Sequence, residues 1–245
     1  AEGEQLRVVV GALPNMAASL LPDAVALLTR EHPQLRVRVV SGTNAQLMTQ
    51  LRQGEIDLVV GRLAQPSALV DLGFLQLYSE PLLLVARPGH PLARQVKPEV
   101  AVLAAYPLVV PVQGTLVRDT ADAFLFARGN ALPGAVIEAT DTSFALGLLR
   151  RTDAIWFAPK GAVDSALALG ELVRLDIDTS VTDGPVGITH RRAGEPGDGA
   201  RRRGDGNGQG PGRGPPGGGS GRALARQCAP PASNGASPSR RCAHW

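Results

Sequence analysis

Apolar strands alternate with amphipathic stretches from Leu6 to about Thr189, and this order predicts an α/β protein with largely parallel sheets. In the first half, short apolar runs predict strands at 6–10, 37–40 and 57–61. Between the strands, apolar residues recur at helical spacing. After the turn at 11–15 one helical face carries Ala17, Leu20, Leu21, Ala24, Leu27 and Leu28, and a second helix at Leu47, Met48 and Leu51 stops at Gly54. This half is therefore one βαβαβ unit.

The same alternation recurs in the second half, with predicted strands at 82–86, 108–110, 135–139, 154–158 and 172–175. Helices are expected to open at Gly114-Thr115, at the cap 140–143, and from Lys160 to Leu169. A last apolar strand, 185–189, is placed to return to the first unit. We expect lobe I at 1–82, lobe II at 83–182 and a return strand at 183–192, with crossing strands near 80–87 and 182–189.

Residues 193–245 have a different composition, with 14 Gly and 7 Pro in 53 residues and no periodicity. Such a segment cannot offset its ordering entropy, so we expect it to be disordered. Its eight Arg and three acidic residues give this segment a net charge of +5. Because the whole chain has a net charge of +3, the remaining residues carry −2. An RNA-binding tail is the functional alternative, but aromatic residues are absent before Trp245. The folded part has no Lys/Arg cluster that predicts nucleic-acid binding.

Composition narrows the function further. No apolar run has the length of a membrane span, and the start Ala-Glu-Gly-Glu-Gln lacks a basic, apolar leader, so we expect a cytoplasmic protein without membrane contact. Both cysteines, Cys228 and Cys242, lie outside the predicted fold, and no histidine pairs with another ligand at metal-binding spacing. Nucleotide-binding and nucleophile motifs are absent from the folded part. The expectation is a protein without catalysis, metal or cofactor.

Small polar residues recur where predicted strands end and helices begin, a place where open α/β sheets form crevices. Helix starts there present unpaired N–H groups, and several of them converging would suit a carboxylate. The candidates are Asn15, Thr43, Asn44, Gly114, Thr115, Thr142 and Ser143. Asn, Thr and Ser are also ordinary N-caps, so each one alone is better explained as a cap. Only the set as a whole favours a ligand site.

Arg62 follows Gly61 at the end of a predicted strand. Its guanidinium could hold a carboxylate through two parallel hydrogen bonds. The alternative is a solvated surface arginine, and the sequence leaves both readings open.

The order of segments resembles the effector-binding domain of LysR-type transcriptional regulators. The resemblance covers about residues 5–190 and rests on Leu6-Arg-Val-Val-Val-Gly, Leu21-Pro, Gly54-Glu-Ile-Asp-Leu-Val-Val-Gly and Pro88-Gly-His-Pro-Leu-Ala. It implies a periplasmic-binding-protein-like fold (type 2), with two α/β lobes joined by two crossing strands and an effector between them. It also makes His90 a turn residue without a catalytic role.

Carried over by position, the resemblance makes the polar turns listed above effector-facing, together with Met16, Gln113 and Phe144. It places Arg62 after the third strand of lobe I. The turn Gly11-Ala12-Leu13-Pro14 is similar to that of regulators of protocatechuate-degradation (pca) operons and of sugar-binding-protein genes. It implies a small-molecule effector, an aromatic-catabolite carboxylate or a sugar-derived compound. It further implies a homodimer or tetramer of the intact regulator.

Two departures from the family pattern matter. The family's winged helix-turn-helix, which would contact operator DNA, is absent from this sequence, so a fragment is implied. The family closes lobe I with an amphipathic helix after the return strand, whereas this sequence turns to Gly, Pro and Arg. A frameshift near His190 or Arg191 would explain that change and leave lobe I partly uncovered. Two alternatives stay open: a solute-binding protein of a transporter, and an enzyme with Lys160 in its cleft.

Overall fold

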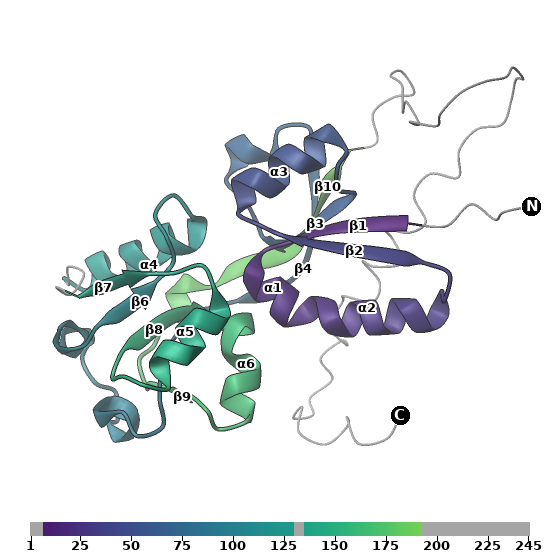
Figure 1. Cartoon of the computed structure of the whole chain (residues 1–245). Helices are drawn as coiled ribbons and strands as arrows, with labels where there is room; N and C mark the ends of the chain where they lie inside the picture. Colours follow the sequence, from purple (N-terminus) through teal and green to yellow (C-terminus); the bar gives the residue numbers. More distant parts are fainter. Residues whose placement is uncertain (1–6, 130–134, 193–245) are drawn as a thin grey trace, which may run out of the picture.

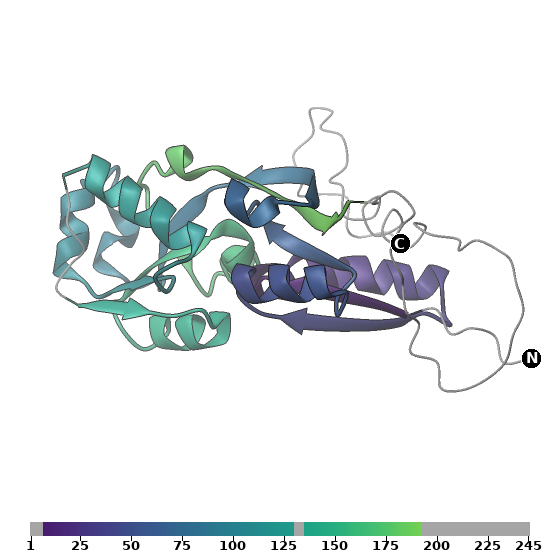
Figure 2. The ribbon, with the colours of Figure 1, turned by 90° about the horizontal axis from the view of Figure 1, so that it is seen from above.

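The computed structural model describes residues 7–129 and 135–192, and within these ranges the chain forms two α/β lobes side by side (Figure 1). Each lobe is built on a mixed five-stranded sheet, with strand order β2-β1-β3-β10-β4 in lobe I and β7-β6-β8-β5-β9 in lobe II. Seen from above, the molecule is elongated, and the connecting segments lie at its middle (Figure 2). The predicted fold class of two lobes joined by two crossing strands is confirmed.

The strands of lobe I are β1 (Arg7–Ala12), β2 (Arg36–Ser41), β3 (Leu58–Arg62), β4 (Leu72–Glu80) and β10 (Gly184–Arg191). Its helices are α1 (Pro14–Ala18), α2 (Leu20–Glu31), α3 (Asn44–Gln53) and the 3-10 turn η1 (Pro66–Leu69). One core packs α1 and α2 against β1, β3 and β10, and the other packs α3 against the opposite sheet face. Helices therefore cover both faces, as the amphipathic patterns require.

The strands of lobe II are β5 (Leu82–Ala86), β6 (Leu108–Val110), β7 (Val136–Glu138), β8 (Ile155–Pro159) and β9 (Val173–Arg174). Its helices are α4 (Leu116–Ala127), α5 (Thr142–Leu149) and α6 (Lys160–Ala168), with 3-10 turns η2 (Pro91–Arg94), η3 (Val100–Ala105) and η4 (Ser180–Thr182). Helix α4 packs on one face of the sheet, and α5 and α6 pack on the other.

Three sequence expectations need correction. The sheets are only half parallel, because β10 runs antiparallel to β3 and β4, and β5 runs antiparallel to β8 and β9. The single helix expected after β1 is two helices that break at Ser19. Pro22 lacks an N–H and its ring would meet the carbonyl four residues earlier, so a new helix starts with Pro22 in its first turn. Strand β4 was not predicted at all.

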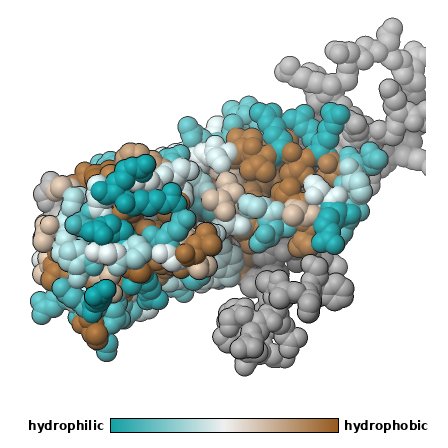
Figure 3. Space-filling view, turned by 60° about the horizontal axis from the view of Figure 1, so that its bottom comes forward, coloured by the Kyte–Doolittle hydropathy of each residue, from teal (hydrophilic) through white to brown (hydrophobic). Residues whose placement is uncertain are grey.

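The expectation for residues 193–245 lies outside the described residues. Both lobes expose apolar side chains: Phe126 of α4 in lobe II is 84% exposed, and Leu27 of α2 and Leu75 of β4 in lobe I are 44% and 46% exposed. Apolar surface gathers on lobe I in the space-filling view (Figure 3). Within the described residues no helix has the length and apolar content to span a membrane.

His90 begins η2 and is buried in lobe II. Its Nδ1 accepts a hydrogen bond from the Leu92 N–H, which leaves Nε2 to donate to the Asp153 carbonyl oxygen at 3.2 Å. Burial lowers the pKa of His90, and this effect outweighs the opposing pull of Asp153. His90 is therefore a neutral structural residue of this turn.

We expect His90 to make the fold sensitive to acid. Because its folded pKa is lowered, its contribution to stability is complete above the ordinary pKa of about 6.5 and is lost as pH falls through the folded pKa. The Tm should therefore be lower at about pH 5 than at about pH 7.5, by a difference that shrinks in His90→Asn, which keeps an acceptor for Leu92. His32→Asn, at an exposed histidine that ends α2, is the control. An undiminished difference in His90→Asn would contradict the assignment.

Candidate functional site

The carboxyl ends of six strands, three parallel strands in each sheet, face the junction between the lobes. In lobe I, Arg62 at the end of β3 pairs with Val186 near the start of β10, so β3 ends at the crossing, and β1 and β2 run parallel to it. In lobe II, Pro159 at the end of β8 pairs with Leu82 at the start of β5, and β6 and β7 run parallel to β8. The turns after these strands therefore open toward the other lobe, where α/β sheets bind ligands.

The lobe I candidates lie on neighbouring turns. The Gly42 N–H donates to the Ala12 carbonyl oxygen and the Leu13 N–H to the Val60 carbonyl oxygen, which ties the turns after β1, β2 and β3 together. Thr43 caps α3 in a complete capping box with Gln46. Asn44 beside it has a buried Oδ1 without a hydrogen-bond partner. Since buried acceptors are nearly always satisfied, this oxygen stands out as an unsatisfied acceptor beside the start of α3.

Met16 differs from the other candidates because it is fully buried. It belongs to the core beneath α1 and α2, and its sulfur lies 3.7 Å from the Tyr78 hydroxyl. Asn15 precedes it and is half-buried, with its Nδ2 donating to Glu80 Oε1 at 3.3 Å. The side chain of Asn15 therefore already has a partner from the crossing strand.

The lobe II candidates sit at the starts of α4 and α5. Gly114 has φ +75°, and Thr115 caps α4 by accepting from the Arg118 N–H, while its hydroxyl donates to the Val112 carbonyl oxygen. The predicted cap role for Thr115 is confirmed. The cap expected within 140–143 is Asp141, whose carboxylate accepts from the Phe144 N–H. Of the other lobe II candidates, Gln113, Ser143 and Phe144 are exposed, and Thr142 is half-buried.

Arg62 is neither a solvated surface arginine nor an open anion receptor. It is 5% exposed, and its Nη2 donates to the Thr182 carbonyl oxygen on the second crossing segment. Its guanidinium lies over Gly184, where any side chain would collide with it. Burial lowers the pKa of Arg62, while Glu80 and Asp183 nearby oppose that shift. Its Nη1 is buried without a partner.

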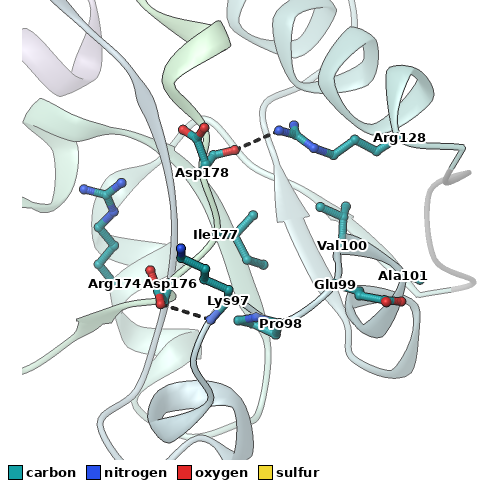
Figure 4. Close-up of a pocket in the computed structure, with 10 residues that line it drawn as sticks. All are labelled: Lys97, Pro98, Glu99, Val100, Ala101, Arg128, Arg174, Asp176, Ile177 and Asp178. Atoms are coloured by element: carbon teal, nitrogen blue, oxygen red, sulfur yellow. Dashed lines mark hydrogen bonds between the residues drawn. The ribbon is translucent and has the colours of Figure 1, made fainter.

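Two cavities among the described residues contain none of the predicted site residues. One of about 560 Å³ lies in lobe II (Figure 4), lined by Lys97, Pro98, Glu99, Val100, Ala101, Arg128, Arg174, Asp176, Ile177 and Asp178. Its charged rim is partly paired, since Arg128 donates to the Asp178 carbonyl oxygen at 3.1 Å and the Lys97 N–H donates to Asp176 Oδ2 at 3.0 Å. The Arg128 guanidinium also lies over the Phe124 ring.

The other cavity, about 310 Å³, lies at the seam between the lobes. It is lined by Ser19, Leu20, Tyr78, Ser79, Glu80, Lys160, Gly161 and Asp164. Lys160, on which the enzyme alternative rests, forms an ion pair here, because the Lys160 Nζ lies 2.6 Å from Asp164 Oδ2. Among the described residues no group of three or more His, Cys, Asp or Glu is placed to hold a metal ion.

Sequence reasoning overlooked Glu80, a buried carboxylate at the crossing between the lobes. It is 3% exposed and accepts hydrogen bonds from both lobes. Burial raises the pKa of Glu80, and the Gly161 N–H, Arg62 and Lys160 oppose the shift. The available signal was a single carboxylate directly before Pro81, at the start of the apolar strand 82–86.

Comparison with known proteins agrees with this architecture. The transcriptional regulator PcaQ of Agrobacterium fabrum is 38% identical over 192 residues, which cover 77% of this chain and 61% of PcaQ. The chain thus spans less than two thirds of that regulator. The Synechocystis PCC6803 CcmR regulatory domain in complex with 2-PG has a TM-score of 0.68 at 17% identity, over 78% of this chain and 90% of that one.

A further solved structure, the effector-binding domain of QuiR in complex with shikimate, has a TM-score of 0.63 at 22% identity. The matched region covers 77% of this chain and 88% of the QuiR chain. The relatives are transcriptional regulators, so the transporter alternative is not favoured. Residues 1–202 match the family described as the LysR substrate binding domain, and the chain belongs to that family.

Proposed function

We propose that this domain binds a small hydroxylated carboxylate in the gap between its lobes and thereby acts as the sensor of a LysR-type regulator. The observation that carries the proposal is that the carboxyl ends of three parallel strands in each sheet face the junction between the lobes, followed by the starts of α3, α4 and α5. Helix starts offer N–H donors and positive dipole ends to an anion. The unpartnered Oδ1 of Asn44 calls for a donor on the same ligand, such as a hydroxyl.

In an intact regulator, binding would favour one closure of the lobes or one subunit arrangement, and so bias how the DNA-binding heads meet their half-sites. A homodimer or tetramer and operator contact through an amino-terminal head are part of this proposal. The effector is of the aromatic-catabolite or sugar-derived class, and the similarity to PcaQ and to the shikimate-bound QuiR domain supports a carboxylate.

A thermal-shift panel of aromatic carboxylates, hydroxylated carboxylates including shikimate, and neutral sugars tests the proposal. At a concentration of about 100 times its Kd, a ligand of the folded state stabilises it by about 2.7 kcal/mol, which raises the Tm of a domain this size by about 5–10 °C. We expect carboxylates to give such a shift and neutral sugars to give none.

We expect the double variant Thr43→Val, Thr115→Val to lose the ligand-induced rise in Tm. Without ligand, each missing cap should also lower the free energy of unfolding by about 1 kcal/mol. Thr49→Val is the matched control, since Thr49 lies on the exposed side of α3 and bonds only within the helix, to the Ala45 carbonyl oxygen. If no carboxylate stabilises the domain, or if the double variant keeps the full shift, the proposed site is wrong.

A further inference from the structure

Glu80 ends β4 at the point where the chain leaves lobe I, and its carboxylate contacts both lobes. Oε1 accepts from Asn15 Nδ2 of α1 in lobe I at 3.3 Å. Oε2 accepts from the Gly161 N–H in the first turn of α6 in lobe II at 2.9 Å. The partners are 65 and 81 residues away in sequence, so a single side chain joins three distant segments. We call this arrangement the Glu80 bridge.

The seam around the Glu80 bridge is tightly packed at Gly161. A Cβ added there would lie 3.1 Å from Glu80 Oε2, 3.1 Å from Ser19 Oγ and 3.3 Å from Met16 Cε. These distances are tighter than most Cβ contacts, so a methyl group would require the Glu80, Ser19 and Met16 side chains or the first turn of α6 to shift by a few tenths of an ångström. The seam therefore has little room for a side chain at position 161.

The charges around Glu80 favour a fixed position for its carboxylate. Arg62 from β3 and Lys160 from α6 attract it, and Asp164 from α6 repels it. The Glu80 side chain is nearly inaccessible to water. In such a buried place hydrogen bonds are electrostatically stronger, and an unpaired acceptor costs more free energy. Rotating the lobes apart would strip the Gly161 N–H from Oε2, so the bridge resists that motion.

We propose that Glu80 is a positioning residue that sets the separation of the two lobes and hence the width of the effector gap. Its consequence for the effector rests on the proposed function, whereas its effect on lobe geometry does not. Asn15 belongs to both the Glu80 bridge and the proposed effector site. Its amide donates to Glu80, and it lies at the start of α1, just after β1. An effector that accepts a hydrogen bond from the Asn15 amide would weaken the bond between Asn15 and Glu80. Effector binding would thereby be coupled to movement of the lobes.

Distances between spin labels on the two lobes test the proposal without any effector. Cys228 and Cys242 are replaced by serine, and labels are placed through Gln53→Cys at the end of α3 and Phe126→Cys on α4, both exposed positions. The parent should give a narrow distance distribution. Glu80→Ala should displace and broaden it, and Glu80→Gln, which keeps an acceptor oxygen, should restore it in part.

Glu171→Ala is the matched control, because Glu171 also loses an ion pair, with Arg150, but lies within lobe II. Its distribution should equal that of the parent. Where Glu80→Ala fails to fold, Gly161→Ala replaces it, since the added methyl group should displace the same distance without removing a charge. A parental distribution in the variant that folds overturns the role of Glu80. Displaced lobes in a protein that binds no carboxylate would instead count against the proposed function alone.

Discussion

Gly187→Ala is expected to be among the most destabilising single-methyl changes in this domain. Gly187 lies at the bulge where β10 shifts register against β4. A Cβ there would collide with the Leu75 carbonyl oxygen and lie 2.8 Å from Phe74 Cζ and 2.9 Å from Gln76 Cα. Two of these three atoms belong to backbone and cannot rotate away. Strand β4 would have to separate from β10, so we expect a loss of about 3 kcal/mol and a Tm lower by about 6–12 °C.

Chemical denaturation followed by circular dichroism measures this loss. Gly147→Ala is the control, because it adds the same methyl group within α5, where the nearest atom is the end of the Arg151 side chain at 3.4 Å. That change should be neutral or stabilise the helix by about 0.5–1 kcal/mol. Equal stability of Gly187→Ala and the parent would mean that β4 does not pair as described.

The second large effect concerns the buried charges Arg62 and Glu80. Both are at most 5% exposed, and burial dominates the pKa shift of each, lowering that of Arg62 and raising that of Glu80. Removing one partner of a buried charge pair leaves the other uncompensated, which costs about 3–5 kcal/mol in other proteins. Because the Glu80 bridge supplies further partners, we expect Arg62→Met to cost about 3 kcal/mol near neutral pH.

A double-mutant cycle separates the charge effect from lost packing. The Glu80→Gln variant has no carboxylate that the loss of Arg62 could leave unpaired. In that background Arg62→Met should lower the free energy of unfolding by only about 1 kcal/mol, which gives a coupling energy of about 2 kcal/mol. The raised folded pKa of Glu80 adds a pH signature: its contribution to stability is present below the unfolded pKa and is lost as pH rises through the folded pKa. The penalty of Arg62→Met should therefore shrink on acidification. Additive losses at all pH values would show that the two charges do not interact.

Sequence patterns predicted the buried strands well. Strands β5 and β6 have the expected bounds because both are continuous apolar runs buried on both faces. The end of α3 at Gly54 was also predicted, and Gly54 adopts φ +75° there. Strand β4 was missed because it is an edge strand of lobe I with mixed polarity, and its bulge against β10 breaks the alternation. A period of two cannot be read through a bulge.

The candidate site was predictable only as far as local chemistry reaches. Thr43 and Thr115 were expected as helix caps and cap α3 and α4. Within the cap segment expected at 140–143, Asp141 is the residue that caps α5, because its carboxylate accepts from the Phe144 N–H. The burial of Arg62 and the partners of Glu80 depend on segments up to 120 residues away, and a single sequence does not show which distant segments meet.

The position of β10 has a consequence for how the protein is made. The final strand inserts between β3 and β4, so lobe I joins residues near both ends of the described chain. Lobe II is continuous from β5 to β9. During synthesis on the ribosome, lobe II can therefore complete its sheet while β4 still waits for its only strand neighbour among the described residues. The lobe that is translated first is the last to be finished.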